Sequence, residues 1–181
     1  MSAEESEYRF ISYLEWLSRR GDRAKLAKLR RALGKRPGAT PEAYPMVMPY
    51  VREGASDRIE RIYFLIGSLF ALHPKSWPRV TGDRSAHDFG ASMRLLAARR
   101  EGGGVERRFA ALLVCSEHEL GDHLRRVVTL LKSEDLPIDW VRMISDLKEW
   151  NYELRPAQRS WARSFWSGTA IAERDGDQKT D

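Results

Sequence analysis

The amino-acid sequence predicts an all-α fold, a helical bundle that is bilobed, with two packed helical sub-bundles. Apolar residues recur at spacings of three and four along almost the whole chain, which is the pattern of helices with one buried face. Sustained alternation of β-branched and polar residues, the pattern of strands, is absent. At 181 residues the chain has the length of one domain. Within it we predict an N-terminal helical lobe over 1–75, a C-terminal helical lobe over 76–168 and a disordered polar tail over 169–181.

Three helices are predicted in the N-terminal half, bounded by residues with strong start and stop preferences. Gly21 and Gly34 can take the left-handed conformation that closes many helices. Asp22 and Ser56 can accept hydrogen bonds from the free N–H groups of a first turn. The predicted helices cover about 5–20, 23–33 and 57–73, with a loop over 35–45 and a short helical turn after it.

The C-terminal half begins with a predicted long loop over 74–88 and continues with five helices. The glycines at 102–104 separate the first two helices as a flexible joint. Ser116 and Glu119 have the spacing of a capping box and start the third helix. The apolar positions that mark these helices are Phe89, Met93 and Leu96; Val105, Phe109 and Leu112; Leu120, Leu124 and Val127; Ile144 and Leu147; Trp161 and Phe165.

Composition narrows the class of protein. With 42% hydrophobic and 31% charged residues, the chain has the make-up of a folded protein. The single cysteine, Cys115, excludes a disulfide framework and a Cys-rich zinc site, and fits a reducing compartment. The acidic, polar first residues do not resemble a signal peptide, and apolar runs of about five or six residues are too short to cross a bilayer. We therefore expect a cytoplasmic protein with no membrane association.

The excess positive charge is clustered near the N-terminus. Lys and Arg number 31 against 26 Asp and Glu, which gives a formal net charge of +5. Between positions 19 and 36 the basic residues, with Asp22 as the sole acid, are Arg19, Arg20, Arg23, Lys25, Lys28, Arg30, Arg31, Lys35 and Arg36. On a helical wheel these charges lie outside the stripe of Leu26, Leu29 and Leu33. They are available to a polyanion, and the ordinary alternative is a solvated helix face.

Three further predicted helices carry arginines away from their apolar stripes, at Arg94, Arg107, Arg125 and Arg126. Several such helices side by side would form one positive surface, which binds phosphates without base-specific geometry. The predominance of Arg over Lys suits bidentate phosphate contacts, although a G+C-rich genome also favours Arg codons.

The sequence contains no complete catalytic or cofactor-binding motif. His118 and His123 are five residues apart, about 140° around a helix, and cannot share a zinc ion as the four-residue spacing allows. Cys115 lies in an apolar run and is predicted to be core rather than nucleophile. Six tryptophans could stack on bases; core packing is their ordinary role, and Trp77 in the long loop is the one most open to a partner. We expect no enzyme activity, no metal site and no cofactor.

Eight short segments, taken in their order between Tyr8 and Gly168, carry a family resemblance. They are residues 29–34, 44–45, 69–74, 89–96, 105–109, 123–127, 137–140 and 161–166. Together they resemble the CasB family, the small subunit of the type I-E CRISPR surveillance complex Cascade. The glycines at 102–104 depart from the family pattern.

The resemblance implies an all-helical, bilobed subunit without catalytic activity, present in two head-to-tail copies. Its implied partners are the large subunit, the backbone subunits, guide RNA and target DNA, whose opened strands it helps to keep apart. Opening a duplex onto a guide RNA is nearly balanced in free energy, so modest phosphate contacts can decide whether the open state persists. The resemblance implies that nucleic acid is bound by Lys28, Arg30, Arg31, Arg94, Arg107, Arg108, Arg125 and Arg126.

Three other functions stay open on the sequence. A helical protein–protein adaptor without intrinsic nucleic-acid binding would use exposed arginines to dock acidic proteins. An independent RNA-binding or transcription-regulating protein needs a helix that aims Asn, Gln and Arg at base edges, and none is evident. An enzyme acting on nucleic acid needs a metal or general-base cluster, which makes it the least favoured.

Overall fold

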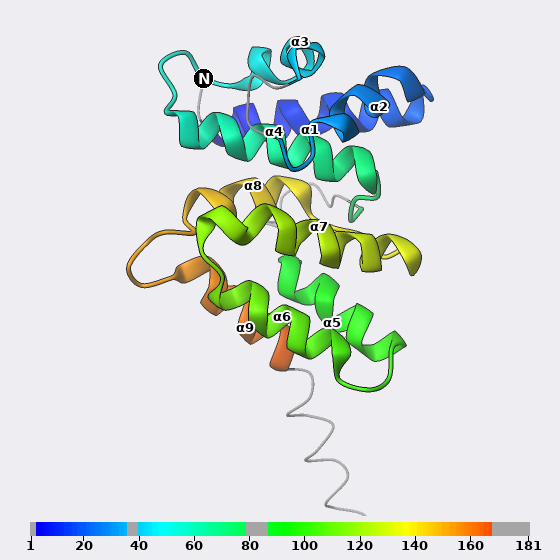
Figure 1. The fold of residues 1–181 in the computed structure, drawn as a ribbon, viewed down its shortest axis with the longest axis vertical. Coiled ribbons are helices and arrows are strands. Elements are labelled where there is room, and N and C mark those ends of the chain that lie inside the picture. The colour runs from blue at the N-terminus through cyan, green and yellow to red at the C-terminus, as the bar shows by residue number, and fades with distance from the viewer. Residues whose placement is uncertain (1–2, 36–39, 79–86, 168–181) are drawn as a thin grey trace, which may run out of the picture.

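The computed structural model describes residues 3–35, 40–78 and 87–167, and these ranges fold into α-helices and short 3₁₀ turns (Figure 1). The α-helices are α1 (Ala3–Arg19), α2 (Arg23–Arg31), α3 (Tyr44–Val47), α4 (Asp57–Leu72), α5 (Phe89–Arg99), α6 (Gly104–Val114), α7 (Glu117–Ser133), α8 (Trp140–Lys148) and α9 (Pro156–Trp166). Two 3₁₀ turns, Pro41–Ala43 and Met48–Tyr50, flank α3. Within these ranges, extended pairing is limited to an isolated bridge between Ser76 and Ile138. The predicted all-α class is confirmed.

The helices are stacked in tiers along the long axis of the molecule (Figure 1). At one end α1, α2, α3 and α4 pack together, and at the other end α5, α6 and α9 do so. Between them, α7 packs against α4, α5 and α6, while α8 packs against α1 and α4. This is the predicted bilobed arrangement, with α7 and α8 joining the two ends. No helix in the described ranges is long and apolar enough to span a bilayer.

Local sequence signals set several helix ends. Gly21 has a φ of +69°, and the Oδ1 of Asp22 accepts a first-turn N–H of α2 at 3.1 Å. Ser116 and Glu119 form the predicted capping box, in which the Ser116 N–H donates to Glu119 Oε2 at 3.1 Å. Ser56 occupies the N-cap position of α4 but makes no side-chain cap hydrogen bond. An acidic first turn favours the start of that helix instead, because carboxylates stabilise the positive end of the helix dipole.

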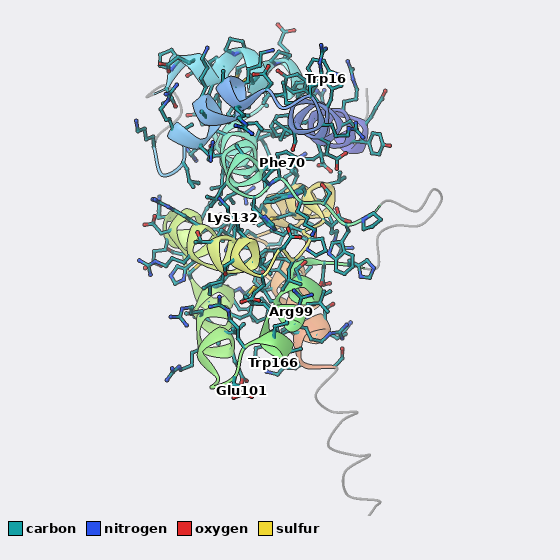
Figure 2. All side chains as sticks on the ribbon, turned by 90° about the vertical axis from the view of Figure 1, so that its right-hand side faces the viewer. Trp16, Phe70, Arg99, Glu101, Lys132 and Trp166 are labelled. Carbon is teal, nitrogen blue, oxygen red and sulfur yellow. The ribbon has the colours of Figure 1, made fainter. Side chains whose placement is uncertain are left out.

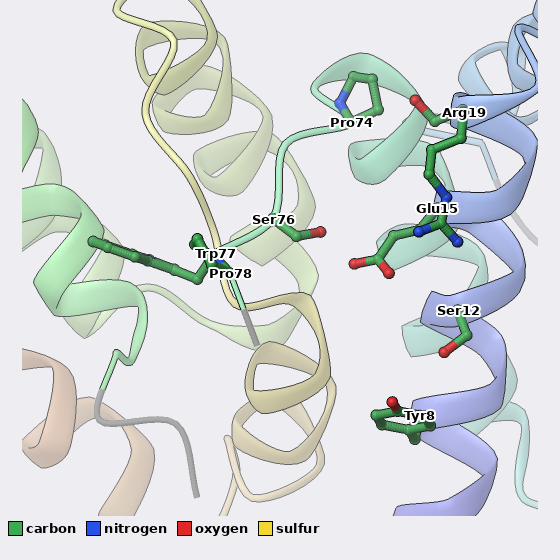
Figure 3. A pocket seen from close by; sticks show the side chains of 9 residues that line it. Tyr8, Ser12, Glu15, Arg19, Pro74, Ser76, Trp77 and Pro78 are labelled. Atoms are coloured by element: carbon green, nitrogen blue, oxygen red, sulfur yellow. The ribbon is translucent and has the colours of Figure 1, made fainter. Parts of the chain in front are cut away.

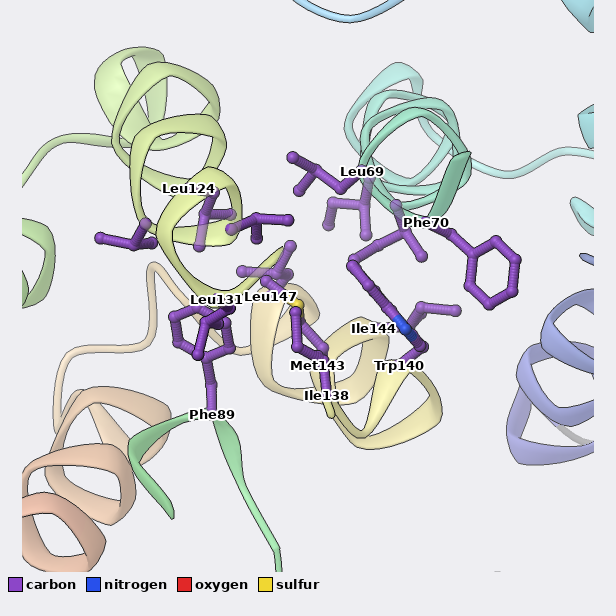
Figure 4. Packing of buried hydrophobic residues seen from close by; sticks show 14 of the residues in the cluster. Leu69, Phe70, Phe89, Leu124, Leu131, Ile138, Trp140, Met143, Ile144 and Leu147 are labelled. Atoms are coloured by element: carbon purple, nitrogen blue, oxygen red, sulfur yellow. The ribbon is translucent and has the colours of Figure 1, made fainter. Parts of the chain in front are cut away.

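Buried apolar side chains form one cluster that continues from lobe to lobe (Figure 4). The Phe70 ring of α4 meets the Trp140 ring of α8 edge to face, with centroids 5.7 Å apart. Phe89 of α5 and Leu131 of α7 extend the same cluster toward the other end of the molecule. Residues on both sides of position 75 therefore share one core, and the division of the chain at 75/76 stays a prediction. The tail predicted over 169–181 lies outside the described residues.

Polar contacts also tie the first lobe to α8. Glu7 of α1 is 3% exposed, accepts the Ser145 hydroxyl at 2.7 Å and pairs with Lys148 Nζ at 2.5 Å. Arg58 of α4 donates to the carbonyls of Leu147 and Lys148, each at 2.9 Å. A cation at the carbonyl end of α8 is favourable for the helix dipole as well as for hydrogen bonding. These contacts and the shared core hold the two lobes as one body.

The chain that leaves α4 is anchored on the turn between α7 and α8. His73 Nε2 lies 2.6 Å from the Leu136 carbonyl, and the Lys75 carbonyl accepts the Ile138 N–H and the Trp140 indole N–H, each at 3.1 Å. The start of the predicted loop over 74–88 is thus held against the second lobe at Lys75. Its residues 79–86 lie outside the described ranges.

Candidate nucleic-acid interface

All eight cations predicted to bind nucleic acid are exposed. They are Lys28, Arg30 and Arg31 on α2, Arg94 on α5, Arg107 and Arg108 on α6, and Arg125 and Arg126 on α7. Among the residues that the structure describes, none of the eight is paired with a carboxylate. Arg108 Nη1 donates to the Gly104 carbonyl of its own helix at 2.9 Å, which leaves its charge uncompensated.

Three mutually packed helices carry five of these arginines. α5, α6 and α7 contact one another, and each buries its apolar stripe in the shared core. On α7, Leu124 and Val127 are buried while Arg125 and Arg126 lie between them in sequence and face away. On α6, Val105 is buried and Arg107, two residues later, points outward for the same reason. We call Arg94, Arg107, Arg108, Arg125 and Arg126 the lower basic group.

The α2 cations lie in the opposite tier of the molecule (Figure 1). α2 packs on α1 and α4, so the tier of α7 and α8 separates it from α5 and α6. We call Lys28, Arg30 and Arg31 the upper basic group. α5, α6 and α7 pack side by side, whereas α2 and the upper basic group lie apart from them; the single positive surface expected from the sequence stays a prediction.

The acid next to the upper basic group is already engaged. The Asp22 carboxylate caps α2 and lies 3.4 Å from Lys25 Nζ. The hydrogen bond from the Lys25 backbone N–H, followed by the side-chain and charge contacts of Lys25, lowers the pKa of Asp22. The charge of Lys28 lowers the pKa of Asp22 further, so the ionised carboxylate offsets mainly the charge of Lys25 and, more weakly, that of Lys28.

Trp77, which the sequence singled out, is half-buried. Its indole stacks on His87 with ring centroids 4.0 Å apart, and its Nε1–H donates to Ser92 Oγ at 3.2 Å. Beside it lies an open depression of about 480 Å³ between α1 and residues 74–78. Figure 3 shows the Trp77 indole extending away from α1 while the Ser76 hydroxyl points toward it. Trp77 thus contributes an edge of the depression rather than an open stacking face.

Sequence reasoning missed a different tryptophan. Trp16 on α1 is 41% exposed and has the Arg20 guanidinium 4.9 Å from its ring centroid. A signal was present in the sequence, because Trp16 lies off the buried stripe of Leu14 and Leu17 and four residues before an arginine.

The remaining reactive side chains are placed for packing. Cys115 is buried in the core as predicted, and burial raises the pKa of its thiol to about 11. In the described ranges no group of three or more His, Cys, Asp and Glu residues is arranged to hold a metal ion.

Comparison with known proteins identifies a family for this chain. The family model of CRISPR-associated protein Cse2 matches residues 25–166. CRISPR-associated protein Cse2 of Thermus thermophilus is 33% identical over 168 residues, which cover 89% of this chain and 92% of that protein. The crystal structure of M. ruber CasB is 29% identical with a TM-score of 0.75, and the match covers 96% of this chain and 98% of that one. A chain of a CRISPR RNA-guided surveillance complex has the same fold, with a TM-score of 0.79 at 22% identity over 97% and 99% of the two chains. The sequence resemblance is confirmed, and the chain belongs to the Cse2 (CasB) family of CRISPR-associated proteins.

Proposed function

We propose that this Cse2-family protein is a non-catalytic small subunit of a type I-E RNA-guided CRISPR surveillance complex. In that complex it binds nucleic acid through the phosphate backbone and stabilises the opened target DNA. The observation that carries the proposal is the set of exposed cations, without carboxylate partners among the described residues, on the outer faces of α2, α5, α6 and α7. The family membership of the chain supports the assignment to a surveillance complex.

The physical argument rests on counterion release. A cation on an outward helix face exchanges condensed counterions for a phosphate, and this gain does not depend on base sequence. A surface of this kind holds a strand in place without selecting it, while the guide RNA supplies the sequence specificity. The two basic groups lie in different tiers, so one molecule offers phosphate contacts at two separated places along its length.

The proposal includes protein partners, namely the large and backbone subunits and a second copy arranged head to tail. An exposed apolar patch supports a protein contact. Val114 at the end of α6 and Leu154 before α9 are 73% and 75% exposed, and Tyr152 is 58% exposed. Arg155 Nη2 donates to the Leu113 carbonyl at 2.7 Å and so brings these two segments together. Apolar side chains gathered at the surface commonly mark contacts with other proteins. The same patch suits the alternative function, a helical adaptor without intrinsic nucleic-acid binding.

Binding to unrelated single- and double-stranded DNAs over a salt series tests the proposal. We expect affinity to fall steeply and equally for all sequences as salt rises. The R107E/R125E double variant should bind more weakly and with a smaller salt slope, by about 0.7 per lost phosphate contact on single strands.

The matched control is R52E/R159E, which changes the net charge equally at exposed arginines outside both basic groups. Circular dichroism should show unchanged helicity in both variants. If the control weakens binding as much as R107E/R125E, net charge rather than the lower basic group governs affinity. Absence of binding even at low salt would favour the adaptor instead.

A further inference from the structure

A ladder of aromatic rings runs from the core of the first lobe to the surface. Phe10 is fully buried, and its ring centroid lies 5.2 Å from that of Tyr63 and 5.4 Å from that of Tyr50. Tyr50 stacks on Tyr13 at 5.2 Å, and Tyr13 stacks on Trp16 at 6.0 Å with an angle of 22° between the rings. The ladder ends at the exposed Trp16 indole. Because each ring rests on the next, the orientation of the indole is set by the core.

Cations surround the exposed end of this ladder. Arg20 follows Trp16 by one helical turn, and its guanidinium lies 4.9 Å from the indole centroid. Arg19 and Arg23 are exposed beside it, and no carboxylate among the described residues forms a salt bridge with any of the three arginines. Asp22 is engaged as the N-cap of α2. Glu15 precedes Trp16, so Arg19, Arg20 and Arg23 stand against the two carboxylates of Glu15 and Asp22. The site therefore combines a flat apolar surface with a small net positive charge.

The exposed indole and the arginines beside it together indicate which kind of ligand the site can bind. A flat indole favours a flat aromatic partner, while the arginines favour an anion linked to it. A nucleotide in a single strand has both features, since its base is free to stack and its phosphates lie alongside. Bases within a duplex already stack on each other and present no free face. Arg23 is also the first residue of α2, which carries the upper basic group, so a strand bound at Trp16 continues toward further cations.

We propose that Trp16 is a stacking platform for an unpaired base of a single-stranded nucleic acid, with Arg19, Arg20 and Arg23 holding the adjoining phosphates. On binding, the Arg20 guanidinium turns from the indole to a phosphate and the base takes its place. This rests on the proposed function and extends it from phosphate binding to discrimination of single from double strands. Figure 2 places Trp16 at the end of the molecule opposite to Trp166, so this contact is separate from the lower basic group.

Another exposed aromatic residue provides a matched control. Tyr152 is 58% exposed, more than Trp16, but lies between Glu149 and Glu153 in sequence. Arg155 is the one cation within three residues of Tyr152, so the local charge is negative rather than positive and does not attract a polyanion. If exposed aromatic area by itself promoted binding, Tyr152→Ala and Trp16→Ala would have similar effects.

The test compares three ligands at fixed salt: an oligothymidine, an abasic oligonucleotide of the same length, and a duplex. The full-length wild-type protein should bind the oligothymidine more tightly than the abasic strand. Trp16→Ala should weaken binding to the oligothymidine by roughly fivefold or more, the usual effect of losing one stacked base, and change abasic and duplex binding little. Trp16→Phe should retain most of the affinity, and Tyr152→Ala should match the wild type.

Fluorescence gives a second readout that does not depend on the alanine variant. Oligothymidine should quench part of the tryptophan emission of the wild type, and Trp16→Phe should remove that part while the protein still binds. Equal binding of oligothymidine and abasic strands by the wild type would overturn the stacking proposal but leave phosphate binding intact. An equal loss on all three ligands in Trp16→Ala would also overturn it. If the wild type binds none of the ligands, it is the proposed function that fails.

Discussion

Gly90→Ala is expected to destabilise the fold, because the backbones of α5 and α9 touch at this position. A Cβ on residue 90 would lie 2.0 Å from the Trp161 carbonyl oxygen, and 2.7 and 2.8 Å from its C and Cα atoms. All three are backbone atoms, so no side-chain rotation relieves the contact. Ordinary van der Waals contact begins at 3.4 Å, so the two helices must separate locally by about 1.4 Å.

Separation of α5 from α9 would loosen specific contacts. The Phe89 and Trp161 rings have centroids 4.9 Å apart, and the Asp88 carboxylate accepts the Ser160 and Ser164 hydroxyls at 2.7 and 2.9 Å. Overpacking of this kind typically costs ~1–3 kcal/mol, and each weakened hydrogen bond adds about 1 kcal/mol. The higher helix propensity of alanine returns at most about 1 kcal/mol. The net expectation is a loss of about 2–4 kcal/mol in the free energy of unfolding, or roughly 4–16 °C in Tm.

Urea unfolding followed by circular dichroism measures this difference. Gly121→Ala on α7 is the matched control, since its Cβ would meet Leu65 Cδ1 at 3.7 Å, an ordinary contact. That variant should be more stable than the wild type by about 0.5–1 kcal/mol through helix propensity. If Gly90→Ala proved as stable as the wild type, α5 and α9 could separate without a loss of stability. That result would refute the argument from close packing.

Three other predictions concern the capping box, the link between the lobes and the cysteine. Ser116→Ala should lower the free energy of unfolding, measured in urea, by about 1 kcal/mol. Glu119→Gln keeps the capping-box pattern and should lower it less; equal losses in the two variants would contradict a stabilising role of the capping box. Glu7→Gln should lower the free energy of unfolding by about 1–3 kcal/mol, because it leaves the Lys148 ammonium and the Ser145 hydroxyl near a neutral, partly mismatched amide. An unchanged free energy of unfolding would mean that solvent replaces these contacts. Since burial raises the pKa of Cys115 to about 11 from 9.0, its thiol should react slowly with a disulfide reagent at pH 8 and quickly after denaturation. The unfolded thiol ionises first as pH rises from 9 to 11, so stability should fall over that range more in the wild type than in Cys115→Ala, and parallel pH profiles would contradict this.

Helix positions could be predicted where the signal is local. Gly21, Asp22 and the Ser116–Glu119 pair act on backbone groups within one turn, so their role does not depend on the rest of the fold. The helical turn α3 was expected only in outline, since it is four residues long and its packing on α4 is a long-range contact. Ser56 was placed correctly at the start of α4, but the expected side-chain hydrogen bond is replaced by other interactions.

In the candidate site, too, features set by local sequence could be predicted, and features set by long-range contacts could not. Outward placement of Arg107, Arg125 and Arg126 follows from the helical period, and the structure finds them exposed. Trp77 was singled out because it lies in a predicted loop, yet its ring stacks on His87, a contact between residues ten positions apart that no local pattern predicts. Trp16 was passed over although its position off the Leu14 and Leu17 stripe indicated exposure, and the stacking of its indole on Tyr13 could be seen only in the tertiary structure.

The sequence by itself determined the all-helical class, most helix boundaries and the outward orientation of the cations. Each of these follows from residues within a few positions of one another. The tertiary structure alone decided that the upper and lower basic groups lie in different tiers, that Gly90 touches the backbone of α9, and that an aromatic ladder ends at Trp16. These features depend on contacts between residues far apart in the chain, and a local hydrophobic period carries no information about which helices meet.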